Sequence, residues 1–321
     1  MIKVINLTKI YKTHIKQNNP FKDVFLRKYK DIVALDNVSF EIGEKESVGF
    51  IGPNGAGKTT TLKIISGILY PTSGFVLIDE FTPFEKNPRF LKQIAFVMGQ
   101  RNQLIWDLPA TDTFELQKEI YEIPEQHYKK NVGELTDILK CSDLISKPVK
   151  TLSLGERMKM ELIAGLLHRP KIVFFDEPTI GLDIFSQETI RTFIKQFQEE
   201  FKSTVILTSH YLEDVKKLSK RLIIINKGRI IYDGTLKKII EQYSLTKRVT
   251  ITLEKPANET ELRAIDIPIS YTFPKVVYKI KRSVLPEKIK AITQNLPFSD
   301  LSVEDETIED IIKVFFKEQK R

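Results

Sequence analysis

Cysteine is nearly absent from this sequence of 321 residues, in which Cys141 is the only one. One cysteine cannot form a disulfide within the chain, and such usage fits a reducing cytoplasm. Histidine is also rare, with four residues at spacings that do not indicate metal ligands. These shortages argue against a scaffold held by disulfides and against a metal site built from histidine and cysteine.

Long apolar runs are missing as well. No stretch approaches the roughly 20 apolar residues that a helix needs to cross a bilayer. The first residues, MIKVINLTKIYK, alternate like a β-strand and do not resemble a signal peptide. We therefore expect a protein that associates with a membrane only through a partner.

Charge of one sign is only weakly in excess. The sequence has 50 Lys and Arg against 42 Asp and Glu, a formal net charge of +8. An excess of this size is typical of a lysine-rich surface, although it also permits contact with an anionic membrane or with nucleic acid. Hydrophobic residues make up 41% of the chain, which is enough for a sizeable globular core.

Strands and helices alternate along most of the chain. Strands are predicted at 2–10, 33–42, 46–51, 75–78, 94–97, 172–175, 204–208 and 222–225, and helices at 59–69, 186–201 and 212–218. This alternation predicts an α/β core with parallel strand pairing. Helical periodicity dominates from 103 to 169, which predicts a helical insertion into that core. We expect residues 1–243 to form this domain.

A second, smaller domain is predicted at 244–321. Strands are expected at 249–253, 276–281 and 300–303, and helices at 287–293 and 308–316. This mixture predicts a compact C-terminal α+β appendage. Its role stays open between regulation, dimerisation and capping of the fold.

A polar, basic insertion at 12–32 separates the first two predicted strands, 2–10 and 33–42. Phe21, Val24, Phe25 and Tyr29 recur at helical spacing between lysines and an arginine. This pattern predicts a basic amphipathic helix, which could lie on a membrane or a partner, or pack on its own domain.

A glycine-rich loop, GPNGAGKTT, follows the strand at 46–51 and precedes a helix. It fits the pattern G-x-x-x-x-G-K-[ST], in the strand–loop–helix context that a phosphate-binding loop requires. Lys58 can reach the β- and γ-phosphates of a nucleotide, and Thr59 can ligate Mg²⁺. The residues predicted to surround the phosphates are Gly52, Pro53, Asn54, Gly55, Ala56, Gly57, Lys58, Thr59 and Thr60.

Two carboxylates end the apolar run Ile172–Phe175. Asp176, at the end of a buried strand, can hold Mg²⁺ directly or through water. Glu177 follows at the tip of the strand and can polarise an attacking water. Together with the glycine-rich loop, this pair predicts hydrolysis of ATP.

Taken in order, the motifs between residues 2 and 240 resemble those of ATP-binding cassette (ABC) ATPases. The resemblance implies a P-loop NTPase fold, an ABC nucleotide-binding domain with a helical insertion. Gln100 matches the Q-loop glutamine, which touches Mg²⁺ and couples to the insertion. His210, in LTSH, matches the switch histidine near the γ-phosphate, and Tyr11 matches the aromatic residue that stacks on adenine. Thr179–Asp183 resembles the D-loop.

The segment Leu152–Glu156, LSLGE, resembles the signature loop of the family, which usually reads LSGGQ. The resemblance implies a dimer, in which Ser153 and Gly155 of one copy close over the phosphates bound to the other. Leu154 replaces a glycine and Glu156 replaces a glutamine. These departures put the rate of turnover in doubt, but not nucleotide binding.

Within the family, the chain resembles the stand-alone ATPase subunit of bacterial exporters that use a separate permease. This implies ATP and Mg²⁺ as cofactors, an integral-membrane permease and a second ATPase copy as partners, and a peripheral position on the cytoplasmic face of the cell membrane; no nucleic acid is expected. Lys58, Gln100, Glu177 and His210 are the expected catalytic residues, and Thr59, Gln100 and Asp176 the metal ligands. The alternatives are an importer ATPase, an ABC ATPase acting on ribosomes or DNA, and a regulatory binder without hydrolysis.

Overall fold

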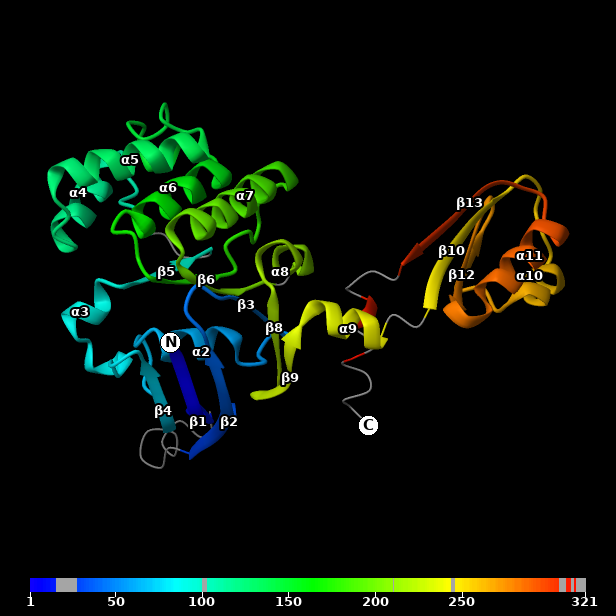
Figure 1. Cartoon of the computed structure of the whole chain (residues 1–321), viewed down its shortest axis with the longest axis horizontal. Helices are drawn as coiled ribbons and strands as arrows, with labels where there is room; N and C mark the ends of the chain where they lie inside the picture. The colour runs from blue at the N-terminus through cyan, green and yellow to red at the C-terminus, as the bar shows by residue number, and fades with distance from the viewer. Residues whose placement is uncertain are drawn as a thin grey trace. The chain divides into compact units, whose positions relative to one another are not determined.

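The computed structural model describes residues 1–15, 28–99, 103–209, 211–243, 246–305, 310–312 and 315. The chain forms two compact units, Met1–Gly234 and Thr235–Arg321 (Figure 1). The domain boundary expected between residues 243 and 244 stays a prediction. The two units are described separately below.

The first unit is built on a six-stranded sheet with the strand order β5-β6-β7-β3-β8-β9. The strands are β3 (Ser47–Ile51), β5 (Ile94–Met98), β6 (Ile172–Asp176), β7 (Thr204–Thr208), β8 (Arg221–Asn226) and β9 (Arg229–Thr235). Neighbouring strands from β5 to β8 pair in parallel, as predicted. Because the carboxyl ends of parallel strands share one edge, the loops that follow β3, β6 and β7 meet there.

Helices cover both faces of this sheet, because its strands are apolar on both sides. Figure 1 shows α6 and α7 on one face and α2 on the other. The helices of the first unit are α2 (Lys58–Ile65), α3 (Pro88–Leu91), α4 (Ala110–Ile120), α5 (Glu125–Leu139), α6 (Leu154–Leu166), α7 (Ile184–Phe201) and α8 (Leu212–Leu218). Helices α4, α5 and α6 lie between β5 and β6 in the chain, which confirms the predicted helical insertion. Among the described residues, no helix has both the length and the apolarity that crossing a membrane requires.

An antiparallel sheet packs beyond α2. Its strands are β1 (Ile2–Ile15), β2 (Lys28–Ile42) and β4 (Ser73–Ile78), in the order β2-β1-β4. Leu7, Leu35 and Phe50 are completely buried members of one core that this sheet shares with α2 and the parallel sheet. The ring of Phe50 meets that of Phe40 edge-on at 5.3 Å, an arrangement that aromatic pairs prefer.

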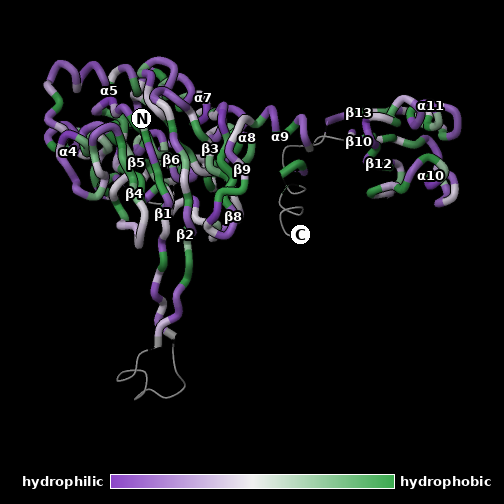
Figure 2. The backbone as a smooth tube through the Cα atoms, turned by 60° about the horizontal axis from the view of Figure 1, so that its bottom comes forward, coloured by the Kyte–Doolittle hydropathy of each residue, from purple (hydrophilic) through white to green (hydrophobic). Residues whose placement is uncertain are grey.

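The β1–β2 ladder continues away from this sheet as a two-stranded ribbon (Figure 2). Its last pairs are His14 with Tyr29 and Ile15 with Lys28. The predicted helix is therefore wrong for Tyr29, because cross-strand pairing satisfies the backbone and brings the His14 and Tyr29 rings within 5.9 Å. The predicted helical positions Phe21, Val24 and Phe25 lie outside the described residues.

The second unit begins with α9 (Leu236–Tyr243) and contains an antiparallel sheet in the order β11-β12-β10-β13. Its remaining elements are β10 (Thr246–Leu253), α10 (Glu259–Ile265), β11 (Ser270–Thr272), β12 (Lys275–Lys281), α11 (Leu285–Asn295) and β13 (Phe298–Asp305). Every second residue of β10 and β12 is buried, including Val249, Ile251 and Tyr278, so one face of the sheet holds a core. This confirms the predicted α+β appendage, to which the structure adds α10 and β11.

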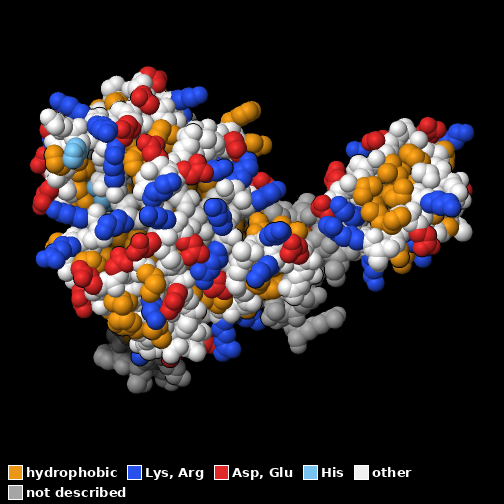
Figure 3. All heavy atoms as spheres, viewed as in Figure 1, with side chains coloured by type: hydrophobic (Ala, Val, Ile, Leu, Met, Phe, Trp, Pro, Cys, Tyr) orange, Lys and Arg blue, Asp and Glu red, His pale blue; other side chains and the backbone are white. Residues whose placement is uncertain are grey.

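Charged side chains of both signs are interspersed over the face of the molecule drawn in Figure 3. Lysines and arginines lie next to aspartates and glutamates instead of forming one continuous basic field.

Candidate nucleotide site

The glycine-rich loop connects β3 to α2, and its last residues, 58–60, form the first turn of that helix. Gly57 has a φ of 113°, which favours glycine, and a Cβ there would lie 2.7 Å from the carbonyl oxygen of Ala34. The Gly228 N–H donates to the carbonyl of Ala56 at 2.9 Å. No side chain caps the start of α2 at Gly57. The first N–H groups of this helix can therefore face phosphate oxygens.

Lys58 is folded back over the loop. Its Nζ donates to the carbonyls of Gly52 at 2.7 Å and Pro53 at 3.2 Å, and the residue is only 5% exposed. Burial lowers the pKa of the Lys58 ammonium, while the nearby charges of Glu177 and Asp176 act in the opposite direction. The ammonium is thus placed to exchange carbonyl partners for phosphate oxygens.

Asp176 is the point where three segments meet. Its Oδ1 accepts hydrogen bonds from Thr59 Oγ1 at 2.9 Å and from Thr208 Oγ1 at 2.6 Å. The structure therefore brings the predicted metal ligands Thr59 and Asp176 together. Hydroxyl and carboxylate oxygens are the donors that Mg²⁺ prefers, so this pair fits that ion. The role of Thr208 as a hydrogen-bond donor to Asp176 was not predicted. Its position at the end of a predicted strand, next to Ser209, was a signal that its hydroxyl could reach this edge of the sheet.

Glu177 follows Asp176 in a left-handed conformation, with a φ of 55°. Its N–H lies 3.1 Å from the carbonyl and 3.2 Å from the hydroxyl of Thr208. The Gly99 N–H donates to the carbonyl of Asp176 at 3.0 Å, and a Cβ on Gly99 would lie only 2.0 Å from the carbonyl oxygen of Glu177. The backbone leading to residue 100 is therefore fixed against the carboxylate pair.

Two predicted site residues, Gln100 and His210, lie outside the described residues. The residues that flank them are described, and both flanks converge on the same edge of the sheet. Gly99 bonds to Asp176, and Thr208 bonds to both Asp176 and Glu177.

A buried carboxylate that the sequence did not reveal joins the D-loop to the segment before His210. Asp214 is fully buried and accepts hydrogen bonds from Thr179 Oγ1, Ser209 Oγ and Arg191 Nε, the last at 2.6 Å. An aspartate inside a short helix carries no local signal of this role. The network fixes the turn after Glu177 relative to the end of β7.

The signature loop forms the start of α6. Ser153 Oγ accepts from the Glu156 N–H at 3.3 Å, and the Glu156 carboxylate accepts from the Ser153 N–H at 2.8 Å. These bonds form a capping box and lower the pKa of Glu156. The unusual Glu156 is thus occupied within its own helical turn. Gly155 has no room for a side chain, because a Cβ would lie 2.3 Å from Ser186 Oγ on α7.

Tyr11 lies on β1 with 38% of its surface exposed. Ile32 is its cross-strand neighbour on β2, and Lys9 Nζ lies 5.3 Å from the centre of its ring. An exposed aromatic ring next to a cation can stack on a nucleotide base.

Glu161, in the middle of α6, holds the segment that follows Gln100. The residue is 3% exposed, and both of its carboxylate oxygens accept from the Gln103 N–H, at 2.9 and 3.1 Å. Gln103 Nε2 donates to the carbonyl of Phe96 on β5 at 3.0 Å. Burial raises the pKa of Glu161 to about 7. The signature helix and the Q-loop segment are therefore joined through one titratable group.

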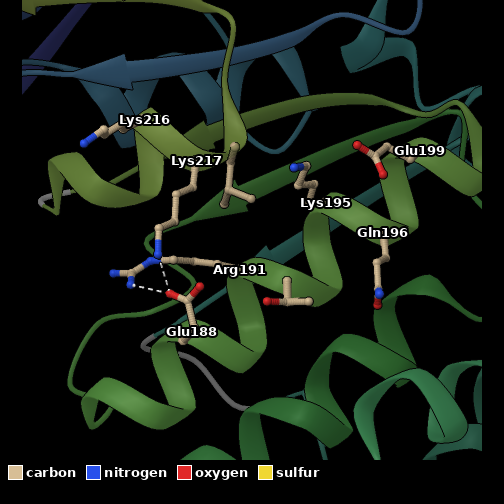
Figure 4. Close-up of a pocket in the computed structure, with 9 residues that line it drawn as sticks. Glu188, Arg191, Lys195, Gln196, Glu199, Lys216 and Lys217 are labelled. Carbon is tan, nitrogen blue, oxygen red and sulfur yellow. Dashed lines mark hydrogen bonds and ion pairs between the residues drawn. The ribbon is translucent and has the colours of Figure 1, made fainter.

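A surface pocket of about 620 Å³ lies between α7 and α8 (Figure 4), and Arg191, which donates to Asp214, is one of the residues that line it. Glu188 forms ion pairs there with Lys217 at 2.7 Å and with Arg191 at 3.3 Å. None of the residues that line this pocket belongs to the predicted site. The candidate nucleotide site lies instead at the carboxyl edge of the parallel sheet, around Thr59 and Asp176.

The chain is similar to proteins that bind ATP for transporters. A family model described as ABC transporter matches residues 35–180. The ABC transporter ATP-binding protein NatA of Bacillus subtilis is 33% identical over 217 residues, 68% of this chain and 88% of NatA. The doxorubicin resistance ATP-binding protein DrrA of Mycobacterium tuberculosis is 33% identical over 208 residues, 65% of this chain and 62% of DrrA. A solved dimeric structure of the ATP-binding cassette MJ0796, in a post-hydrolysis state with ADP and Pi, has a TM-score of 0.61 at 28% identity and covers 74% of this chain and 99% of that one.

The raised pKa of Glu161 predicts a stability that depends on pH. The pKa of the Glu161 carboxyl is 4.5 in an ordinary setting and about 7 in the fold. The protonated group therefore contributes its full stabilisation at pH values below 4.5, and this contribution is lost as the pH rises through about 7. Between pH 5 and 8, the free energy of unfolding of the wild type should fall by roughly 1–3 kcal/mol relative to that of Glu161→Gln. Urea unfolding measures this difference. The exposed Glu119→Gln is the control, and a difference for Glu161→Gln that does not change with pH would contradict the prediction.

Proposed function

This chain belongs to the ABC transporter family of ATP-binding proteins, and from this premise we propose that it is the ATPase subunit that drives a separate membrane permease, in the direction of export. It binds ATP and hydrolyses it to ADP and phosphate, as the ATP-binding proteins of this family do. The further assignments below concern individual residues, Mg²⁺, the partners and the direction of transport.

The observation that carries the proposal is the group of side chains at the carboxyl edge of the parallel sheet. Thr59 and Asp176 share a hydrogen bond of 2.9 Å, and the charges of Asp176 and Glu177 both act on the Lys58 ammonium. Phosphoryl transfer from ATP to water requires a phosphate-binding loop, a positive charge, oxygen ligands for a metal ion and a carboxylate that acts on the water. The glycine-rich loop, Lys58, the pair Thr59 and Asp176, and Glu177 can supply these groups. Three separate segments of the chain supply them at one place.

Each of these groups has a role in hydrolysis. The loop N–H groups and Lys58 bind the phosphates, and Glu177 orients and polarises the attacking water. Thr59 and Asp176 would hold Mg²⁺, with Gln100 as a further ligand; when bound, the ion neutralises charge on the phosphate oxygens. We assign the contact with the γ-phosphate to His210 on its LTSH context, and stacking on adenine to Tyr11.

The signature loop acts on the second copy of the chain. Ser153 and Gly155 form the start of α6, where a hydroxyl and helical N–H groups can face an anion. Two copies closing on two ATP molecules would place each signature loop over the phosphates of the other copy. The MJ0796 structure, which is dimeric and holds ADP and Pi, supports a dimer for this chain as well.

Contact with the permease is assigned to the start of the helical insertion. Ile105, Trp106 and Leu108 are 41%, 47% and 41% exposed, an adjoining apolar group of the kind that marks interaction sites. The guanidinium of Arg157, in the first turns of α6, lies 5.3 Å from the centre of the Trp106 ring. A movement at this surface can therefore pass to the signature loop. Such a subunit works at the cytoplasmic face of the cell membrane as a peripheral protein.

The similarity to DrrA favours export, because resistance to a drug is commonly achieved by removing it from the cell. An importer subunit would use the same nucleotide residues and stays the alternative. An ABC ATPase acting on ribosomes or DNA is a further alternative. On the face drawn in Figure 3 the charges are mixed, whereas nucleic-acid binding favours a continuous basic surface.

Replacing Glu177 separates binding from hydrolysis. Glu177→Gln keeps the shape of the side chain but removes the charge that polarises water, so hydrolysis should fall by about 10²–10⁴-fold while ATP still binds. Phosphate release and equilibrium binding of a fluorescent ATP analogue measure the two effects. Glu119→Gln, on the surface of α4, is the control. Near-normal turnover in Glu177→Gln would remove this residue from its role.

Replacing Lys58 should instead weaken nucleotide binding. Loss of its charge-assisted hydrogen bonds to phosphate should cost about 1.5–3 kcal/mol of binding free energy. Because Lys58 is buried, Lys58→Met is measured beside Lys58→Ala to separate lost charge from lost packing. Wild-type affinity for ATP in Lys58→Met would contradict the assignment.

The proposal as a whole is tested by purification from native membranes. Tagged Glu177→Gln, held as a closed dimer by ATP and Mg²⁺, is captured from detergent-solubilised membranes, with Lys58→Ala as the control that does not close. A polytopic membrane protein should elute with Glu177→Gln. Additional elution of a substrate-binding protein would favour import. Recovery of ribosomes or DNA without any membrane protein would refute the transport function.

A further inference from the structure

The β1–β2 ribbon is defined here as residues 10–15 and 28–33, of which the proposed function uses only Tyr11. Pairing of β1 with β4 ends at Thr8, whereas its pairing with β2 continues to Ile15. The ribbon therefore leaves the three-stranded sheet as two strands, as Figure 2 shows. A two-stranded hairpin alone is marginally stable in water, so a ribbon of this kind gains stability by packing on another surface.

The cross-strand pairs show which side chains share a face of the ribbon. Successive pairs alternate between the two faces. The pair of Tyr11 and Ile32 lies on the face that is assigned to the nucleotide base. The opposite face, called the outer face below, carries the pairs Ile10–Val33, Lys12–Asp31 and His14–Tyr29. The proposed function leaves this outer face without a role.

The outer face exposes apolar side chains at both of its ends. Val33, near the sheet, is 50% exposed, and Tyr29, at the far end, is 54% exposed. The rings of Tyr29 and His14 meet edge-on with their centres 5.9 Å apart, so a packed neighbour holds the tyrosine on this face. Large apolar side chains exposed together on one face indicate a surface that a partner covers.

The charge of the insertion indicates which kind of partner fits. Residues 12–32 contain six Lys and Arg against two Asp, so their net charge of +4 is half of the +8 of the whole chain. Lys12 is exposed on the outer face between its two apolar ends, across from Asp31, and Lys30 is exposed on the opposite face. Excess positive charge beside exposed tyrosine and valine is complementary to anionic lipid headgroups, which lie over an apolar layer.

We propose that the outer face of the β1–β2 ribbon lies on an anionic lipid surface. Tyr29 and Val33 enter the headgroup region, and the Lys12 ammonium contacts lipid phosphates. The ribbon stays at headgroup depth, because the outer edges of a two-stranded ribbon carry backbone groups that need water. Lipid is favoured over nucleic acid, since apolar side chains gain little from a phosphate backbone. This inference rests on the proposed function for the position at the membrane, but it requires no permease.

The test measures binding of the full-length protein to lipid vesicles by flotation, without nucleotide. One set of vesicles contains phosphatidylglycerol and phosphatidylcholine, and the other contains phosphatidylcholine alone. The wild type should bind the anionic vesicles and not the neutral ones. Added salt should weaken this binding, because it screens exposed charges.

Tyr29→Ser and Lys12→Ser are then tested separately. Lys12→Ser should raise the lipid concentration for half-maximal binding about five-fold, which is the contribution of one cation near an anionic surface. Tyr29→Ser should raise it about ten-fold, because it removes a large side chain from the headgroup region. ATP hydrolysis and the thermal unfolding temperature should change little, since both residues are exposed and lie outside the proposed nucleotide site.

Ile120→Ser on α4 and Lys129→Ser on α5 are the matched controls, with Ile120 56% exposed and the Lys129 side chain 74% exposed. Both should bind vesicles like the wild type, and equal losses in the controls would contradict a contact at the ribbon.

A wild type that does not bind anionic vesicles would overturn the inference, as would Tyr29→Ser with unchanged binding. Binding of duplex DNA in place of the vesicles would identify a nucleic-acid surface and refute the lipid contact. None of these results decides the proposed function, because hydrolysis by Glu177→Gln and capture of the permease are measured separately.

Discussion

The carboxylate of Asp176 is the interaction on which the site depends. One of its oxygens accepts from Thr59, at the start of α2, and from Thr208, at the end of β7. A charged acceptor shared by two hydroxyls fixes the phosphate-binding loop relative to two neighbouring strands more firmly than neutral hydrogen bonds could. Lys58 precedes Thr59 and Glu177 follows Asp176 in the chain, so the groups proposed for binding and for hydrolysis surround one carboxylate.

The parallel sheet brings Thr59, Asp176 and Thr208 together. Strands β6, β7 and β3 are consecutive in the sheet although they are distant in the chain. Because the carboxyl ends of these strands lie at one edge of the sheet, the loops that follow them lie close together there. Buried polar bonds then lock the loops, since Asp214 holds the D-loop and the end of β7, while Glu161 holds the Q-loop segment against α6. The signature helix is therefore connected to the nucleotide edge through ordered contacts.

Local patterns in the sequence predicted much of this molecule. The alternating strands and helices gave the α/β core and its helical insertion, because apolar periodicity reflects which faces are buried. The pattern failed at Tyr29, where helical spacing was also compatible with a strand and cross-strand pairing with His14 decided the outcome. The capping box of Ser153 and Glu156 was not predicted, although the S-x-x-E spacing at the start of a helix is a local signal of it.

The sequence by itself determined the chemical groups of the site: a phosphate loop, a hydroxyl and a carboxylate suited to Mg²⁺, and a signature loop, in the order that ABC ATPases have. Tertiary structure decided which of these groups meet. Thr59 and Asp176 are 117 residues apart, and Gly155 on α6 lies against Ser186 on α7 although a strand separates the two helices in the chain. Such contacts follow from the order of strands in a sheet and from the packing of helices on it, which depend on the whole chain and not on any local pattern.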